Sequence, residues 1–241
     1  MKIIFLITLF LNILFANINL NTQITKIYDI EKNTAKIDIT NLEIGQSGVI
    51  VHTSEEDNII LSQAIITKSN NEHSIISFIK KDILLQDAIP TSKLKPSIGD
   101  KFILNHLYQT SLLIVPNNKS KREVKKLFKN QNFFNEDFFA SYLKLISEPT
   151  PTKKEITDFT HKQQIGTIFI VIENQLFIVD AISFKVLETI NIEINDKTTT
   201  SPFLTKIIEI ERGFWDFGED EIKDYNKYYL KLLNINDGDK Q

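Results

Sequence analysis

Residues 165–187, IGTIFIVIENQLFIVDAISFKVL, consist of two apolar segments that meet at residues 173–175, followed by a third segment after Ser183. Isoleucines at positions 168, 170 and 172 alternate with Phe169 and Val171, so both faces of the first segment are apolar. Strands of this kind lie in the middle of a sheet that is covered on both sides. We therefore expect this stretch to form the core of a domain.

The composition is that of an ordinary globular protein. The chain has 241 residues, of which 42% are hydrophobic and 24% charged, and its net charge is −3. Nucleic-acid binding usually needs an excess of basic residues, so we expect no nucleic-acid partner. Cysteine is absent. This excludes disulfides, thiolate metal sites, a cysteine nucleophile and lipidation at a cysteine.

The first sixteen residues have the pattern of a signal peptide. Lys2 provides a positive charge, an apolar run follows from Ile3 to Phe15, and Ala16 is a small residue suited to cleavage. The run is short for a membrane span. An uncleaved N-terminal anchor is the alternative, because Leu14 is a poor residue at the −3 position. We expect residues 1–16 to be removed, leaving an exported protein without a transmembrane span.

Residues 17–110 are predicted to form a β-rich, barrel-like subdomain. Short segments alternate between apolar and polar residues and are separated by turn sequences. Strands are expected at Gln23–Ile30, Lys36–Ile39, Val49–Val51, Ile59–Thr67, Ile75–Ile79 and Phe102–Leu107. Short strands at this spacing predict a small barrel or a sandwich.

Residues 111–241 are predicted to form an α/β subdomain with a mixed sheet, about four helices and a helix near the C-terminus. Besides the strands of 165–193, we expect strands at 112–115 and 202–211 and helices at 120–130, 136–147, from 152 onward, and at 219–233. Asn135 is a candidate N-cap, and Thr152 with Glu155 forms a capping-box sequence. The whole chain is therefore assigned to the α+β class.

The spacing of apolar residues also predicts which helix faces are buried. The expected core residues are Val124, Leu127 and Phe128 in the first helix; Phe138, Tyr142 and Leu145 in the second; Ile156 and Phe159 in the third; and Ile222, Tyr225, Tyr229 and Leu232 in the last.

No motif predicts catalysis, a metal or a cofactor. The four histidines, at 52, 73, 106 and 161, lack metal-ligand spacing, and no nucleophile-elbow, P-loop or dinucleotide-binding motif occurs. His52 and His106 fall in predicted strands, where a half-buried, hydrogen-bonded histidine is common. The acidic groups at 55–57 and 219–221 and the basic run at 119–126 are interpreted as solvated surface, and the aromatic cluster around Trp215 as core closure. An enzyme would need His52, His106 or His161 gathered with carboxylates in one pocket.

Several sequence blocks, in order, resemble a known family. They are residues 44–51 (IGQSGVIV), 89–91 with 99–100, 112–117 (LLIVPN), 149–151, 165–171 (IGTIFIV), 183–188 (SFKVLE) and 199–203 (TTSPF). With these blocks the chain, from about residue 41 to 217, resembles the N-terminal domain of the plasminogen-binding proteins of Helicobacter and related epsilonproteobacteria.

The resemblance implies an exported surface protein that binds host plasminogen and has no enzyme activity. Long members of the family carry a Lys/Glu-rich C-terminal extension that ends in lysine. The lysine-binding sites of kringle domains bind an ammonium and a carboxylate across an aromatic trough. A lysine at the C-terminus of a chain carries both groups, so it is the best ligand. Here we expect the binding residue to be Lys240, and binding to be weak until Gln241 is removed.

A second interpretation stays open. The order of a β-domain followed by an α/β-domain is also appropriate for a periplasmic scaffold or assembly factor with protein partners in the cell envelope. Localisation would be periplasmic in that case, and at the cell surface or outer membrane in the first.

Overall fold

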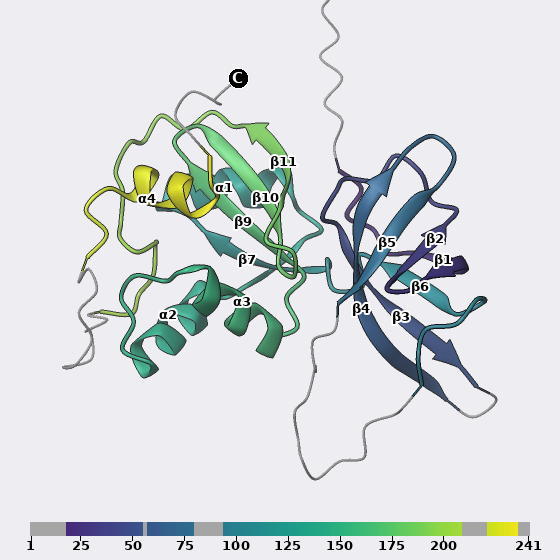
Figure 1. Ribbon diagram of the computed structural model, residues 1–241. Helices are drawn as coiled ribbons and strands as arrows, with labels where there is room; N and C mark the ends of the chain where they lie inside the picture. Colours follow the sequence, from purple (N-terminus) through teal and green to yellow (C-terminus); the bar gives the residue numbers. More distant parts are fainter. Residues whose placement is uncertain (1–17, 55–56, 80–93, 209–220, 236–241) are drawn as a thin grey trace, which may run out of the picture.

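The computed structural model describes residues 18–54, 57–79, 94–208 and 221–235. The strands of residues 23–104 form a closed barrel, and those of residues 110–191 form a mixed sheet with helices (Figure 1). The predicted α+β class, with a small barrel, a mixed sheet and about four helices, is confirmed. The predicted subdomain boundary between residues 110 and 111 stays a prediction. Within the described ranges, no helix is long and apolar enough to cross a membrane.

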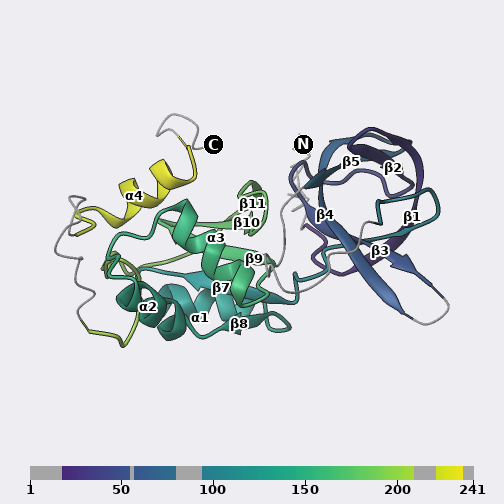
Figure 2. The same ribbon diagram turned by 60° about the horizontal axis from the view of Figure 1, so that its bottom comes forward.

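The barrel has six antiparallel strands in the order β1-β2-β5-β4-β3-β6 and appears nearly end-on in Figure 2. The strands are β1 (Gln23–Glu31), β2 (Thr34–Ile37), β3 (Ser47–Thr53), β4 (Asn58–Ser69), β5 (Ser74–Ile79) and β6 (Lys101–Leu104). Alternate residues point inward, and nine of them form a buried apolar core that includes Ile50, Ile66 and Phe102. Closure pairs both edges of the sheet, so the barrel has no open edge.

The second sheet has the strand order β11-β10-β9-β7-β8. Its strands are β7 (Thr110–Ile114), β8 (Asn132–Phe134), β9 (Thr167–Ile172), β10 (Gln175–Asp180) and β11 (Val186–Asn191). β7 pairs in parallel with β8 and β9, whereas β9, β10 and β11 are antiparallel. β9 is a central strand, as predicted, and the two-residue turn after it has Glu173 at a φ of 52°.

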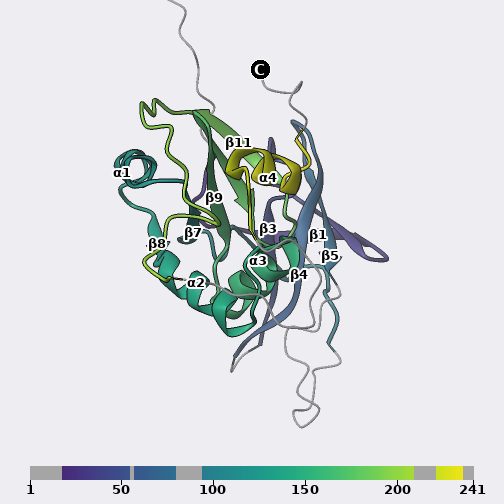
Figure 3. The same cartoon turned by 90° about the vertical axis from the view of Figure 1, so that its left-hand side faces the viewer.

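Helices cover both faces of this sheet. On one side, α1 (Asn118–Leu127) packs over Phe169 and Val171; on the other, α2 (Glu136–Leu145), α3 (Lys153–Lys162) and α4 (Tyr225–Leu232) cover the isoleucines of β9 (Figure 3). The alternation that predicts two apolar faces is thus confirmed. The N-caps Asn135 and Thr152 are also confirmed, the latter with its capping box.

Some predicted core faces are wrong. Phe138 and Leu145 are 61% and 82% exposed, and α2 instead buries Phe139, Ala140 and Leu143. Both stripes have helical spacing, and the choice depends on a distant partner, because Phe139 stacks on Phe203 with ring centroids 5.3 Å apart. In α1, Leu127 is exposed for the same reason, since the sheet contacts Val124 and Phe128.

Three element predictions also need correction. Residues 202–208 do not form a strand; the Leu204 amide donates to the carbonyl of Val115, just after β7, and residues 209–211 lie outside the described ranges. β6 ends at Leu104, so His106 lies in a turn. α4 begins at Tyr225 because Asp224 caps it; it buries Tyr225, Tyr229 and Leu230, and Leu232 is only partly buried. Ile222 before the helix, a predicted core residue, and Leu233 after it are also buried. The short strand β8 was not predicted.

A buried carboxylate joins the barrel to the sheet. Asp180, at the end of β10, is 0% exposed. Its Oδ2 accepts hydrogen bonds from the Ser47 hydroxyl of β3 at 2.5 Å and from the Tyr108 hydroxyl at 2.6 Å. Its Oδ1 accepts from the amides of Ile182 and Ser183 at 2.9 and 2.6 Å. Four donors from three parts of the chain therefore converge on one side chain.

Burial and hydrogen bonding act in opposite directions on this carboxylate. Burial raises the pKa of Asp180, and the four hydrogen bonds oppose that rise. Burial also raises the pKa of Tyr108 well above its usual value, so this hydroxyl stays protonated and available as a donor. The polar groups at the junction are thus mutually satisfied, as buried polar groups must be.

Two glycines allow the close approach that this junction needs. A Cβ on Gly166 would lie 2.4 Å from the carbonyl carbon of Leu107, and one on Gly45 would lie 2.6 Å from the Cβ of Lys185. Gly45 also has a φ of 102°, which disfavours other residues. A larger side chain at either position would force the barrel and the sheet apart.

We predict that Asp180→Ala lowers the free energy of unfolding by at least about 3 kcal/mol, because it leaves buried donors without an acceptor. The exposed Asp38→Ala is the control, with an expected change within about 0.5 kcal/mol. Urea denaturation measures both values. Equal small losses in the two variants would show that the junction does not depend on Asp180.

Candidate functional site

A groove lies between α3 and α4. Its volume is about 1290 Å³, and its walls come from residues 150–158 on one side and 222–234 on the other. Both helices lie on the same side of the sheet (Figures 2 and 3). The groove is therefore built by segments that are about seventy positions apart in sequence, and its shape depends on how each helix is anchored.

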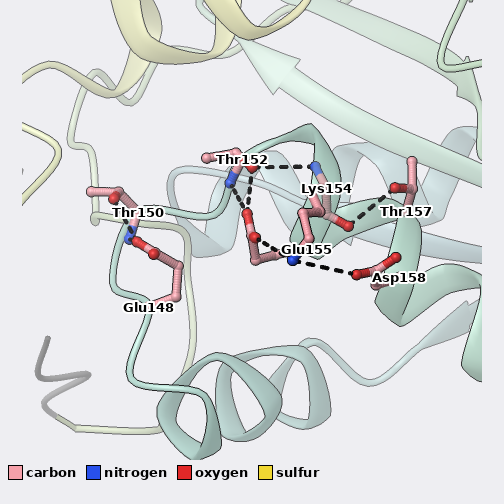
Figure 4. A network of polar contacts seen from close by, with 7 residues as sticks. All are labelled: Glu148, Thr150, Thr152, Lys154, Glu155, Thr157 and Asp158. Atoms are coloured by element: carbon pink, nitrogen blue, oxygen red, sulfur yellow. Dashed lines mark hydrogen bonds and ion pairs between the residues drawn. The ribbon is translucent and has the colours of Figure 1, made fainter. Parts of the chain in front are cut away.

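The first wall is fixed by the start of α3 (Figure 4). Thr152 caps the helix by accepting a hydrogen bond from the Lys154 amide at 3.2 Å, and its own amide donates to Glu155 Oε2 at 2.9 Å. Partial burial opposes ionisation of Glu155, but the hydroxyl and amide of Thr152 outweigh it and lower the pKa of Glu155. The capping box thus holds a carboxylate at this helix end and defines where the wall begins.

Lysines stand along this wall. Lys154 is 78% exposed, and its ammonium lies 3.7 Å from Glu155 and 3.8 Å from Asp158. Lys153 is placed over the ring of Phe184, 5.1 Å from its centroid. Exposed ion pairs at such distances contribute little free energy, so Lys154 can exchange partners readily.

The second wall, α4, is anchored by three tyrosines. Tyr225 donates to the carbonyl of Val171 in β9 at 3.0 Å, and Tyr229 donates to the carbonyl of Pro202 at 2.8 Å. Burial raises the pKa of both well above the usual value, so they remain neutral donors. Tyr228 crosses the groove floor and donates to the carbonyl of Pro151 at 3.1 Å. The two walls are therefore tied to each other as well as to the sheet.

A row of lysines lies along the second wall, with Lys223 just before the N-cap Asp224 and Lys227 and Lys231 on α4. Lys223, Lys227 and Lys231 are all exposed and line the groove. Within the ranges that the structure describes, none of these three ammonium groups forms an ion pair. Asp224, between them in sequence, is occupied as the N-cap of α4 and accepts from the Lys227 amide at 3.0 Å.

The groove has a charge opposite to that of the whole protein. Five lysines line it, at positions 153, 154, 223, 227 and 231, against two carboxylates, Asp158 and Asp224. The difference, five minus two, is an excess of three positive charges on a chain whose net charge is −3. Such a concentration of one sign attracts anionic groups. The residue types present can bind and orient a ligand by charge, hydrogen bonds and apolar contact.

The histidines are not brought together. His52 Nδ1 lies 2.7 Å from Asp100 Oδ1 in the barrel, and this pair links β3 to the turn before β6. His106 lies in the turn after β6, where burial lowers its pKa. His73 follows the turn between β4 and β5, and His161 is exposed on α3. In the described part of the chain, no group of three or more histidine and acidic side chains could hold a metal ion.

Lys240, the binding residue expected from the sequence, lies outside the described residues, as do Trp215 and residues 1–16. The groove lysines were not anticipated. The sequence indicates two of them only by the spacing of Lys227 and Lys231. This spacing places both side chains one helical turn apart, on the face opposite the buried Tyr225 and Tyr229. The contribution of Lys153 and Lys154 could not be found this way, because it depends on how two distant segments pack.

Comparisons with known proteins identify relatives across most of the chain. A family model described as "Plasminogen-binding protein pgbA N-terminal" matches residues 19–233. Plasminogen-binding protein PgbA from Helicobacter pylori strain J99, and that from strain 26695, are each 24% identical to this chain over 208 residues. The matched region covers 85% of this chain and 46% and 45% of the two relatives, so the chain spans slightly less than half of their length. No solved structure matches.

The contribution of the capping box to the groove wall can be measured. Thr152→Ala removes the N-cap hydroxyl, and we predict a loss of about 1 kcal/mol in the free energy of unfolding. Thr157→Ala, on the same helix, removes a γ-methyl and a hydroxyl that donates to the Lys154 carbonyl but does not cap the helix, and should cost less than about 0.5 kcal/mol. If urea denaturation gave equal losses for both, the wall would not depend on the cap.

Proposed function

Because the chain belongs to the family of the N-terminal part of the plasminogen-binding protein PgbA, we propose that it is an exported, non-enzymatic envelope or surface protein that binds host plasminogen through lysine. The observation that carries this proposal is the family match over residues 19–233. The curated relatives are named as binding proteins and not as enzymes. Export is supported by the signal-peptide pattern of residues 1–16.

The proposed ligand is the ammonium group of Lys240. A lysine-binding site pairs an ammonium with acidic side chains and packs the aliphatic stem on aromatic rings, where a cation is further attracted by the ring faces. A carboxylate on the same residue supplies the second charge that such a site recognises. Lys240 has that carboxylate only when Gln241 is removed. Trimming of one residue would therefore convert a weak ligand into a stronger one.

We predict that the protein without Gln241 binds immobilised plasminogen about tenfold more tightly than the intact protein, since one charge-assisted contact is worth about 1.5 kcal/mol. Lys240→Ala should abolish this gain, and a free lysine analogue should compete with the trimmed protein. Lys129→Ala, at an exposed position after α1, is the control and should behave like the intact protein. Equal affinities of the intact, trimmed and Lys240→Ala proteins would refute the role of Lys240.

A periplasmic scaffold or assembly factor is the second candidate function. It is favoured by the junction at Asp180, which holds the barrel and the sheet together as two faces of one body. Such a body can contact two envelope proteins at once.

Localisation distinguishes the two functions. If the protein is at the surface, external protease should degrade it on intact cells. If it is a periplasmic scaffold, we expect protection until the outer membrane is opened. The purified protein could bind plasminogen normally and still be protected from protease on intact cells. Host plasminogen would then not reach it, and the first proposal would be contradicted.

A further inference from the structure

The lysine row along the second wall borders a groove that also has an apolar surface. Lys223, Lys227 and Lys231 stand on its rim, and Ile222, Tyr228 and Leu232 contribute to its lining. We propose that this groove binds an acidic segment of a partner protein in an extended conformation, with its carboxylates on the lysine row and its intervening apolar side chains on the lining. This goes beyond plasminogen binding, in which the protein supplies a lysine to a site on its partner.

The spacing of the lysines agrees with an extended ligand. Lys227 and Lys231 are four residues apart on a helix, which places them about 6 Å apart along its axis. Side chains on the same face of an extended chain repeat every second residue, about 6.6 Å apart. A segment with acidic residues at alternate positions can therefore present one carboxylate to Lys227 and the next to Lys231. The residues between them point to the opposite face.

The opposite wall adds to the attraction. Lys153 and Lys154 are exposed at the start of α3, across the groove from the lysine row. Three carboxylates lie near the groove lysines: Asp224 caps α4, and Glu155 and Asp158 lie 3.7 and 3.8 Å from Lys154. Five lysines therefore stand against three carboxylates, and the excess of charge is still positive. An acidic segment would thus have ammonium groups on both sides. Tyr228, fixed by its bond to Pro151, gives the floor a defined aromatic surface.

The shape of the site favours a peptide over other anions. A bilayer is a broad surface and could touch the rim lysines but not the apolar lining between two helices. A sulfated glycan offers charge without apolar side chains. An acidic peptide with alternating apolar residues matches both the rim and the lining. Binding to a membrane or to a glycan is therefore treated as a competing outcome of the test.

The test uses the full chain and a fluorescent ten-residue peptide of alternating glutamate and valine, with a glutamine–valine peptide for comparison. Fluorescence anisotropy is measured at increasing NaCl concentrations. Lys223→Gln, Lys227→Gln and Lys231→Gln are combined in one variant. Lys125→Gln, Lys126→Gln and Lys129→Gln, on and after α1, form a control that removes the same charge from another exposed surface. Because all six lysines are exposed, both variants should retain the fold, which circular dichroism checks.

We expect the affinities of the glutamate peptide for the unaltered protein and for the Lys125, Lys126 and Lys129 variant to agree within about twofold. The variant that lacks Lys223, Lys227 and Lys231 should bind this peptide at least about tenfold more weakly. Salt should weaken binding, because exposed charges are screened. Equal loss in both triple variants, or equal binding of the glutamine peptide, would overturn the proposal. So would binding to phosphatidylglycerol vesicles or heparin in the absence of peptide binding. The plasminogen experiment changes residues 240 and 241, with residue 129 as its control, and no lysine of the groove, so either proposal can fail separately.

Discussion

The Asp180 carboxylate is the constraint on which the arrangement of the molecule depends. It lies at the end of β10, fully buried, and it accepts hydrogen bonds from Ser47 of the barrel and from Tyr108 of the connection between barrel and sheet. A buried carboxylate costs free energy unless its oxygens are satisfied, and here each oxygen has two donors. The buried Asp180 side chain is therefore tolerated only when the barrel and the sheet are placed so that these donors reach it. The glycines at positions 45 and 166 allow the backbone to come close enough.

Three of the blocks that carry the family resemblance converge on this junction. Residues 44–51 contain Gly45 and Ser47, residues 165–171 contain Gly166, and residues 183–188 follow Asp180 and contact Gly45. These segments make the joint between the two sheets and not the groove between α3 and α4. The resemblance in these three blocks is therefore explained by architecture, and architecture predicts a binding activity less well than a site does. For this reason the groove and Lys240 each need their own experiment.

The sequence predicts local structure well where one physical rule dominates. Alternation with two apolar faces predicts β9 as a central strand, and the short polar side chains of Asn135 and Thr152 predict where α2 and α3 begin. The rule fails where two faces compete. In α2, the stripe through Phe138 and the stripe through Phe139 are equally apolar, and stacking on the distant Phe203 decides between them.

The junction and the groove could not be predicted, because both depend on partners that are far apart in sequence. Ser47 and Asp180 are 133 positions apart, and nothing in the local pattern of either residue indicates the other. The same is true of the lysines on α3 and α4. Only the helical spacing of Lys227 and Lys231 was visible in the sequence, and spacing alone does not reveal a groove.

The central claim is that the buried carboxylate makes the barrel and the sheet one cooperative unit. Differential scanning calorimetry of the purified protein tests it most directly. We expect a single unfolding transition in which the calorimetric and van't Hoff enthalpies agree. Two separate transitions, one for the barrel and one for the sheet with its helices, would contradict it.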